Sequence, residues 1–156
     1  MSVERITHMD VEELILAHPE IAHFGSEAYA VDDGWVKKAE DALGVVFSDS
    51  YKWFLKKYAG GEIGSEEIYS IYGKDFATVN GGDIVFKYIS GIKNKTTERG
   101  KIVVSETDYG EVFFFDSTGL VGGEYPIKLR LPSGKVLEYA ADFYEFLYKR
   151  VHAYLP

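Results

Sequence analysis

Apolar residues recur at helical spacing between Trp35 and Gly61, which is the most regular stretch of the chain. Its first half places apolar residues on one side of a helix and charged residues on the other. Those apolar residues are Trp35, Val36, Ala39, Ala42 and Leu43. Its second half repeats the pattern with Tyr51, Phe54, Leu55 and Tyr58. We predict two short helices joined by a tight turn, each burying its apolar stripe against the rest of the fold.

The ends of both predicted helices carry residues that commonly start or stop a helix. The candidate N-caps are Asp32 or Asp33 for the first helix and Ser48 or Asp49 for the second. Gly44 can end the first helix in the left-handed conformation, and Gly60-Gly61 stops the second.

The chain before this stretch is less regular. Val11, Leu14 and Ile15 predict an amphipathic turn or two over Asp10–His18, which Pro19 interrupts. A further apolar segment without a clear period runs to Gly25. We expect residues 1–31 to be an N-terminal extension that packs on the same domain.

The residues after Gly61 alternate between turn signals and apolar runs. We predict a loop over Glu62–Glu67, a strand over Ile68–Tyr72 and a loop over Phe76–Gly82. Asp83 can then cap a helix whose apolar face comprises Ile84, Val85, Tyr88, Ile89 and Ile92. The β-branched content of residues 83–97 makes a strand the competing interpretation.

The last third of the chain shows the pattern of strands followed by a helix. Short turns separate apolar runs at 102–104, 112–115, 125–131 and 135–139. Asp142 can cap a final helix with Phe143, Phe146, Leu147 and Val151 facing inward, and we expect Arg150 to hold its charge at the edge of that stripe. Successive strands with short connections favour an antiparallel sheet. We therefore predict one α+β domain over residues 1–156, a mostly antiparallel sheet flanked by an N-terminal helical hairpin and a C-terminal helix.

The order of these motifs resembles that of the SUKH superfamily, the Smi/Knr-type domain. The signature residues between 40 and 61 are Glu40, Leu43, Gly44, Phe47, Tyr51, Phe54, Leu55, Gly60 and Gly61. Further motifs of the family match Ile71-Tyr72-Gly73, Ile102–Ser105, Asp108–Gly110, Phe113–Asp116, Tyr125-Pro126-Ile127 and Phe143–Leu147. Ser48 and Ala59 depart from the family's usual Pro and Asn. The resemblance spans about Asp32 to Val151 and favours a helix at 83–97.

Composition sets broad limits on the class of protein. The chain has 156 residues, 46% of them hydrophobic, which suits one domain with a well-filled core. No apolar run approaches the ~20 residues that a membrane helix needs, and the N-terminus lacks an apolar signal core. There is no cysteine, so thiolate chemistry and disulfides are excluded. We expect a cytoplasmic protein with no membrane partner.

Charge is concentrated in the first third of the chain. The formal net charge is −8, and residues 1–50 hold eleven acidic residues against Arg5, Lys37 and Lys38. Such a region would repel phosphates, which argues against nucleic-acid binding. It suits a basic protein partner because complementary charge steers encounter. The simpler alternative is that the acidity only maintains solubility.

Chemical motifs are scarce. The four histidines lack the spacing of a metal site, and no phosphate loop or nucleophile elbow is present. The remaining candidates for acid–base chemistry are Glu106, Asp108, Glu111 and Asp116. We favour the interpretation that these carboxylates surround a solvated hairpin turn. We therefore predict no catalytic residue, no cofactor and no metal.

A partner surface is the remaining class of site. Trp53 is either the flank of a wide apolar stripe or an exposed anchor, since its neighbours already define an inner face. The candidate partner-binding residues are Asp32, Asp33, Trp53, Glu62, Asp108 and Tyr109.

The residues alone do not name a function. The resemblance implies a non-enzymatic immunity protein that binds a cognate polymorphic toxin, often a nuclease, and blocks it by occlusion. The family's fungal members imply the alternative of a regulatory or scaffolding domain in cell-wall signalling. A carboxylate-based enzyme or a glycan binder is a third alternative.

Overall fold

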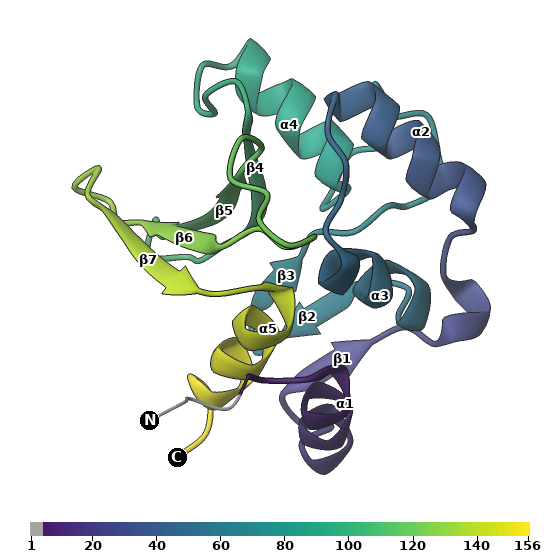
Figure 1. The fold of residues 1–156 in the computed structure, drawn as a ribbon, viewed down its shortest axis with the longest axis vertical. Coiled ribbons are helices and arrows are strands. Elements are labelled where there is room, and N and C mark those ends of the chain that lie inside the picture. The colour runs from purple at the N-terminus through teal and green to yellow at the C-terminus, as the bar shows by residue number, and fades with distance from the viewer. Residues whose placement is uncertain (1–4) are drawn as a thin grey trace.

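The computed structural model of the chain describes residues 5–156, and these form two antiparallel sheets and five α-helices (Figure 1). The first half contains α1 (His8–Ala17), β1 (Ala22–Phe24), the 3₁₀ turn η1 (Glu27–Tyr29), α2 (Asp33–Leu43), α3 (Asp49–Lys57), β2 (Gly61–Ile63) and β3 (Glu66–Ile68). The second half contains α4 (Ile84–Lys93), β4 (Lys101–Glu106), β5 (Val112–Asp116), β6 (Ile127–Arg130), β7 (Val136–Ala140) and α5 (Phe143–His152). The predicted α+β class with antiparallel pairing is confirmed.

The first sheet has the strand order β1-β2-β3 and consists of three-residue strands. Phe24 of β1 lies opposite Gly61 of β2, which in turn lies opposite Ile68 of β3. The Tyr69 N–H donates to the Val104 carbonyl at 2.8 Å, and the Ser105 hydroxyl donates to the Glu67 carbonyl at 2.8 Å. These bonds hold the first sheet against β4 of the second.

The second sheet has the order β4-β5-β6-β7, so each strand pairs with its neighbour in the chain. The apolar run of β5 is buried on both faces, as its sequence predicts. Ile127 and Leu129 of β6 are buried, whereas Lys128 and Arg130 are partly exposed. Strand β7 forms the outer edge and is mostly exposed.

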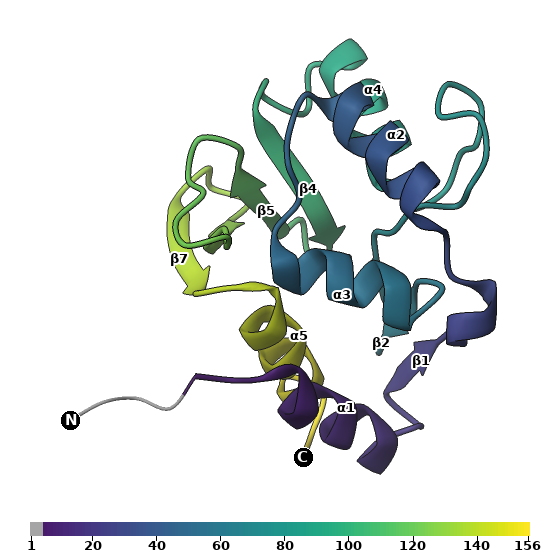
Figure 2. The same cartoon turned by 45° about the vertical axis from the view of Figure 1, so that its right-hand side comes forward.

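The five helices contact different parts of the sheets. α2 packs beside α4, whereas α3 and α1 pack beside α5 (Figures 1 and 2). The two helices expected to form a hairpin therefore pack against different neighbours. Rings of α3 and α5 meet in the core, where the Phe143 ring lies 4.9 Å from Tyr51 and 5.2 Å from Phe54, between centroids.

The helix boundaries confirm most of the capping signals. The Asp32 carboxylate accepts the Trp35 N–H at 3.0 Å, and the Ser48 hydroxyl accepts the Tyr51 N–H at 3.2 Å. Gly44 ends α2 with a φ of 70°. Asp83 caps α4, so the helix interpretation of this region is correct and the strand alternative is wrong. Ala42, expected on the buried stripe, is exposed.

Two predictions for the first sheet are wrong. The expected loop over Glu62–Glu67 is the β2–β3 hairpin, and the expected strand over Ile68–Tyr72 leaves the sheet after Ile68. The irregular segment before Gly25 contains β1. Three-residue strands are too short to show an alternating pattern, and long-range pairing sets their ends.

Arg150 also differs from expectation, because most of its side chain is buried against Glu66 rather than held at an edge. Its Nη2 lies 2.5 Å from Glu66 Oε1 and its Nε lies 3.1 Å from Glu66 Oε2. The two side chains are 12% and 4% exposed. A charge that packs inside a fold needs such a partner, and Glu66 lies in the segment expected to be a loop.

The N-terminal segment contacts the remainder through α1, which packs beside α5, and through β1, which pairs with β2. Residues 1–4 of the expected extension lie outside the described residues. No helix within residues 5–156 combines the length and apolarity needed to cross a membrane.

Candidate protein-binding groove

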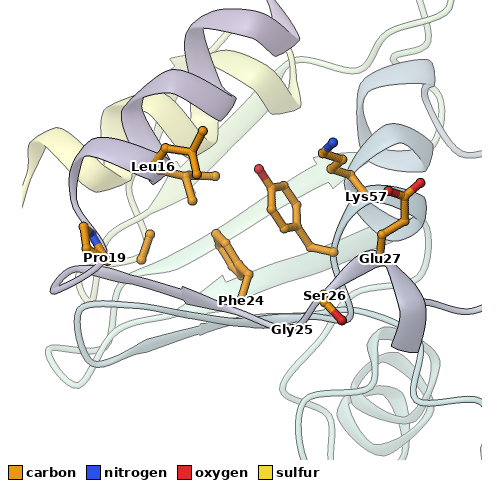
Figure 3. Close-up of a pocket in the computed structure, with 10 residues that line it drawn as sticks. Leu16, Pro19, Phe24, Gly25, Ser26, Glu27 and Lys57 are labelled. Atoms are coloured by element: carbon orange, nitrogen blue, oxygen red, sulfur yellow. The ribbon is translucent and has the colours of Figure 1, made fainter.

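A hollow of about 440 Å³ lies between α1 and the segment from β1 to η1, and we call it the α1–β1 groove (Figure 3). Its lining combines apolar residues with a few polar ones: Ile15, Leu16, Pro19, Ala22, Phe24, Gly25, Ser26, Glu27, Lys57 and Tyr58. Figure 3 shows Leu16 and Phe24 projecting into it from opposite sides.

One wall of the groove is α1. The Thr7 side chain caps this helix by accepting the Asp10 N–H at 3.3 Å, and Val11 and Ile15 turn inward. Leu16 follows Ile15 by one residue, so it points about 100° away from the buried face. It is 81% exposed. The helix therefore presents a large apolar side chain to solvent at the rim of the groove.

The floor of the groove is aromatic and fixed in position. The Phe24 ring lies 5.4 Å from Phe54 and 5.1 Å from Tyr58, measured between centroids. Burial, with the nearby Glu12 carboxylate as a second cause, raises the pKa of Tyr58 to about 12. The phenol therefore remains protonated at neutral pH.

The rim carries more negative than positive charge. Lys57 Nζ lies 3.0 Å from Glu12 Oε1, and a hydrogen bond from Lys57 lowers the pKa of the Glu12 carboxyl. Glu20 bonds to His18 at 3.1 Å, while Glu27 lines the groove directly. Glu12 and Glu27 lie near Lys57, and Glu20 follows Pro19 of the lining, so the rim has an excess of negative charge that favours a cationic ligand.

Three of the predicted partner-binding residues lie around α2 and α3. Asp32 caps α2, and the Asp33 carboxylate lies 2.5 Å from Lys56 Nζ. Trp53 is half-buried, with its ring 5.3 Å from Tyr144 and 5.7 Å from Tyr58. It packs as the flank of a wide apolar stripe, next to the floor of the groove.

The other three predicted residues lie elsewhere. Glu62 is exposed on β2 opposite His23, and alternation places both on the face of the sheet away from Phe24. Asp108 and Tyr109 lie on the β4–β5 turn, where Tyr109 is 84% exposed. The six candidates therefore do not form one site.

The groove itself was not predicted. Its one detectable signal is Leu16, an apolar residue outside the stripe of Val11, Leu14 and Ile15. The part played by Phe24 depends on pairing between β1 and β2, which are separated by two helices in the chain.

Carboxylates also gather away from the groove. Burial raises the pKa of Glu124 and of Asp142, which lie near Asp49 at the starts of α3 and α5. Glu124 accepts the Ser50 N–H at 3.0 Å, and Asp142 accepts the Glu145 N–H at 2.9 Å. These carboxylates cap helices. Across residues 5–156, no three histidine, aspartate or glutamate side chains come close enough together to hold a metal ion.

The model of one family, SUKH_6, described as SMI1-KNR4 cell-wall, matches residues 33–147. The chain belongs to this SUKH family. No curated protein matches the chain.

The match places most of the groove outside the region shared by the SUKH family. Helix α1, strand β1 and η1 all precede residue 33, and among the residues that line the groove only Lys57 and Tyr58 fall within 33–147. The SUKH domain therefore contributes part of the floor, and the segment before it contributes the walls.

Proposed function

We propose that this SUKH domain is a non-enzymatic immunity protein, which binds a cognate polymorphic toxin domain through the α1–β1 groove and blocks it by occlusion. The observation that carries the proposal is an open groove whose walls lie outside the family match. A surface that selects one partner must differ between members of a family, and a segment outside the shared region can vary without disturbing the shared core.

The chemistry of the groove suits a protein partner. Leu16 supplies exposed apolar area, and the packed Phe24 ring supplies a rigid aromatic contact. Such groups contribute most of the binding energy when an interface excludes water. The surrounding carboxylates would steer a basic partner, such as a toxin domain with a cationic substrate site.

Neutralisation by this route needs no reaction on the SUKH domain. A bound domain of this size covers the substrate site of the toxin and places negative charge next to it. Binding should therefore persist when the toxin is catalytically inactive. Association should weaken as salt increases, because the carboxylates on the rim are solvated and screened.

Growth rescue tests the proposal directly. The tagged chain captures its partner from a lysate of the source organism, and the toxic region of that partner is then expressed with the chain. We expect rescue of growth by the native chain and reduced rescue by Leu16→Gln. Met9→Gln is the matched control, since Met9 is also exposed on α1 but does not line the groove. A captured partner whose toxicity the chain leaves unchanged would contradict the proposal.

A regulatory or scaffolding function is the second candidate, and the cell-wall description of the matching family favours it. In that case the chain would bind a non-toxic protein, and the complex would leave growth unchanged in the same assay. Binding to this protein through the same groove would then support the groove but not the immunity function.

A further inference from the structure

The outer edge of β1 runs along the α1–β1 groove. β1 lies at one end of the first sheet and pairs on one side only, with β2. The Ile21 carbonyl accepts from Gly64 N at 2.8 Å, and Gly25 N donates to the Gly60 carbonyl at 2.9 Å. In an antiparallel ladder, alternate residues turn their backbone groups toward the partner strand. Ile21, His23 and Gly25 therefore face β2.

The residues between them turn their backbone groups the other way. The Ala22 N–H donates to the His18 carbonyl at 3.0 Å, so the outward groups left without a partner are the Ala22 carbonyl, the N–H and carbonyl of Phe24, and the N–H of Ser26. None of the hydrogen bonds formed among residues 5–156 uses any of the four. Ser26 continues the extended conformation, with a φ of −79° and a ψ of 159°. The edge thus offers four consecutive groups at the spacing that a further antiparallel strand requires.

The side chains next to this edge define what such a strand would carry. A residue paired with Phe24 would point its side chain to the same face as the Phe24 ring, which is the face that opens into the groove. There it would meet Leu16 and Tyr58. An aliphatic side chain fits this position.

Acidic residues lie at both ends of the edge. Glu20 precedes β1 and is 64% exposed at its side chain, and Glu27 follows Ser26 in η1. Seven residues of extended chain span about 23 Å, so a strand lying along the edge would reach both carboxylates. Lysine or arginine at its two ends would complement them.

We propose that an extended segment of the protein partner, apolar in the middle and basic at both ends, adds to the first sheet as a fourth strand beside β1. The inference rests on the proposed function only in that the partner is a protein. Main-chain hydrogen bonds to the edge would supply affinity, and the groove would select the central side chain.

The edge of β7 is the other open edge to consider, and its surroundings suit a partner less well. The neighbouring side chains have mixed charge, since Lys128 pairs with Glu138 across the sheet and Lys135 directly precedes β7. Lys149 Nζ already bonds to the Tyr139 carbonyl at 2.6 Å. Lysine beside an edge strand is a common protection against unwanted pairing.

Ser26 provides a matched pair of variants. Ser26→Pro deletes one of the four outward groups, and the native φ of −79° is close to the value that proline imposes. Ser26→Ala removes the side chain but keeps the N–H. The Ser26 side chain makes no capping hydrogen bond, so both variants should fold like the native chain.

The probe is a phage-displayed library of random linear peptides, selected against the full chain and then tested as synthetic peptides by fluorescence anisotropy. We expect the selected peptides to have alternating apolar residues flanked by Lys or Arg. Affinity should fall about tenfold for Ser26→Pro and stay within about twofold for Ser26→Ala, because one unpaired main-chain group weakens binding by roughly that factor. Glu27→Gln should weaken binding at low salt, and Glu13→Gln, which changes an acid of α1 that does not line the groove, should not.

Peptides that bind Ser26→Pro and Ser26→Ala equally well, or whose binding slows amide exchange in β7 instead of β1, would overturn the proposal. So would a library that yields no binder. These outcomes leave growth rescue unaffected, since a toxin can bind the groove without adding a strand. Conversely, strand addition can hold for a partner that is not a toxin.

Discussion

The two sheets of this protein differ in the length of their strands and in how far apart the paired strands lie in the chain. The second sheet pairs strands of four to six residues with their neighbours in the chain, and its strand β5 is buried on both faces. The first sheet pairs three-residue strands, and β1 is separated from β2 by α2 and α3. The second sheet is specified by local patterns, whereas the first sheet combines a local hairpin, β2–β3, with the pairing of distant segments in β1–β2.

This difference between the sheets bears on where a partner can bind. A short edge strand held by distant contacts leaves its outer backbone groups unpaired, and here these groups border the α1–β1 groove. The second sheet contributes buried strands to the core, whereas the first sheet carries the surface that we assign to a partner. Changes in the contacts that hold the first sheet should therefore have large effects.

The largest effect is expected at the buried ion pair between Glu66 of β3 and Arg150 of α5. Arg150→Met leaves the Glu66 carboxylate buried without a partner, which should lower the free energy of unfolding by about 3–5 kcal/mol. Urea denaturation measures this change. Asp41→Asn is the control, because it breaks an exposed pair with Lys37 and should cost less than about 1 kcal/mol.

Equal small losses for Arg150→Met and Asp41→Asn would show that the pair does not hold the first sheet. The double variant Glu66→Leu/Arg150→Met sharpens the test. Removing both charges together should recover part of the loss, since no unpaired charge then remains.

The next effect is expected at Gly61 of β2, which lies opposite Phe24 of β1. Gly61 has a φ of 146°, and an added Cβ would overlap the His23 backbone oxygen. Gly61→Ala should therefore cost at least about 2 kcal/mol. Gly44→Ala is the matched control, because its φ is also positive but nothing lies within 4 Å of the added Cβ. It should cost about 1 kcal/mol in thermal or urea unfolding.

If Gly61→Ala and Gly44→Ala lose the same stability, the close approach of β1 to β2 is not a tight constraint. The contrasting result is that Gly61→Ala loses more stability and also abolishes partner binding, while the amides of the second sheet still exchange slowly. That result would show that the first sheet is a separate functional unit.

The smallest effect is expected at Glu124, in the segment that leads into β6. Burial raises the pKa of this carboxyl above its ordinary value of 4.5, so the folded state keeps the proton to higher pH than the unfolded state does. Stability is consequently lost as pH rises through the range just above 4.5. Glu124→Gln removes this loss. Between about pH 4 and pH 7, its free energy of unfolding should therefore rise relative to that of the native chain, by less than about 1 kcal/mol.

Glu98→Gln should show the opposite trend. A hydrogen bond with Lys101 lowers the pKa of Glu98, so its ionised form stabilises the native chain above about pH 4.5 and this stabilisation disappears as pH falls. Unfolding free energies of both variants measured against pH check the two signs, and parallel curves would contradict them.

Local signals predict much of this fold. Four predicted N-caps start their helices in the structure: Asp32, Ser48, Asp83 and Asp142. An N-cap can be predicted from local sequence because its side chain bonds to a backbone N–H only two or three residues later. The alternation from Ile127 to Arg130 likewise shows one face of β6 directly.

Long-range partners explain what the sequence does not reveal. Glu66 reads as a loop residue until Arg150, which is 84 positions away, is placed beside it. Phe24 gains its place in the groove only through pairing with β2. The predicted contact residues Glu62 and Tyr109 are exposed as surface residues should be, but no sequence pattern states which exposed residues share a face.

Amide hydrogen exchange of the full chain, with and without its captured partner protein, tests the central claim most directly. We predict that binding slows exchange at Phe24 and Ser26 and in the exposed face of α1 around Leu16, while β6 and β7 remain unchanged. Slowed exchange confined to β6–β7 or to α2 and α4, with Phe24 and Ser26 unaffected, would contradict the assignment of the α1–β1 groove as the partner surface.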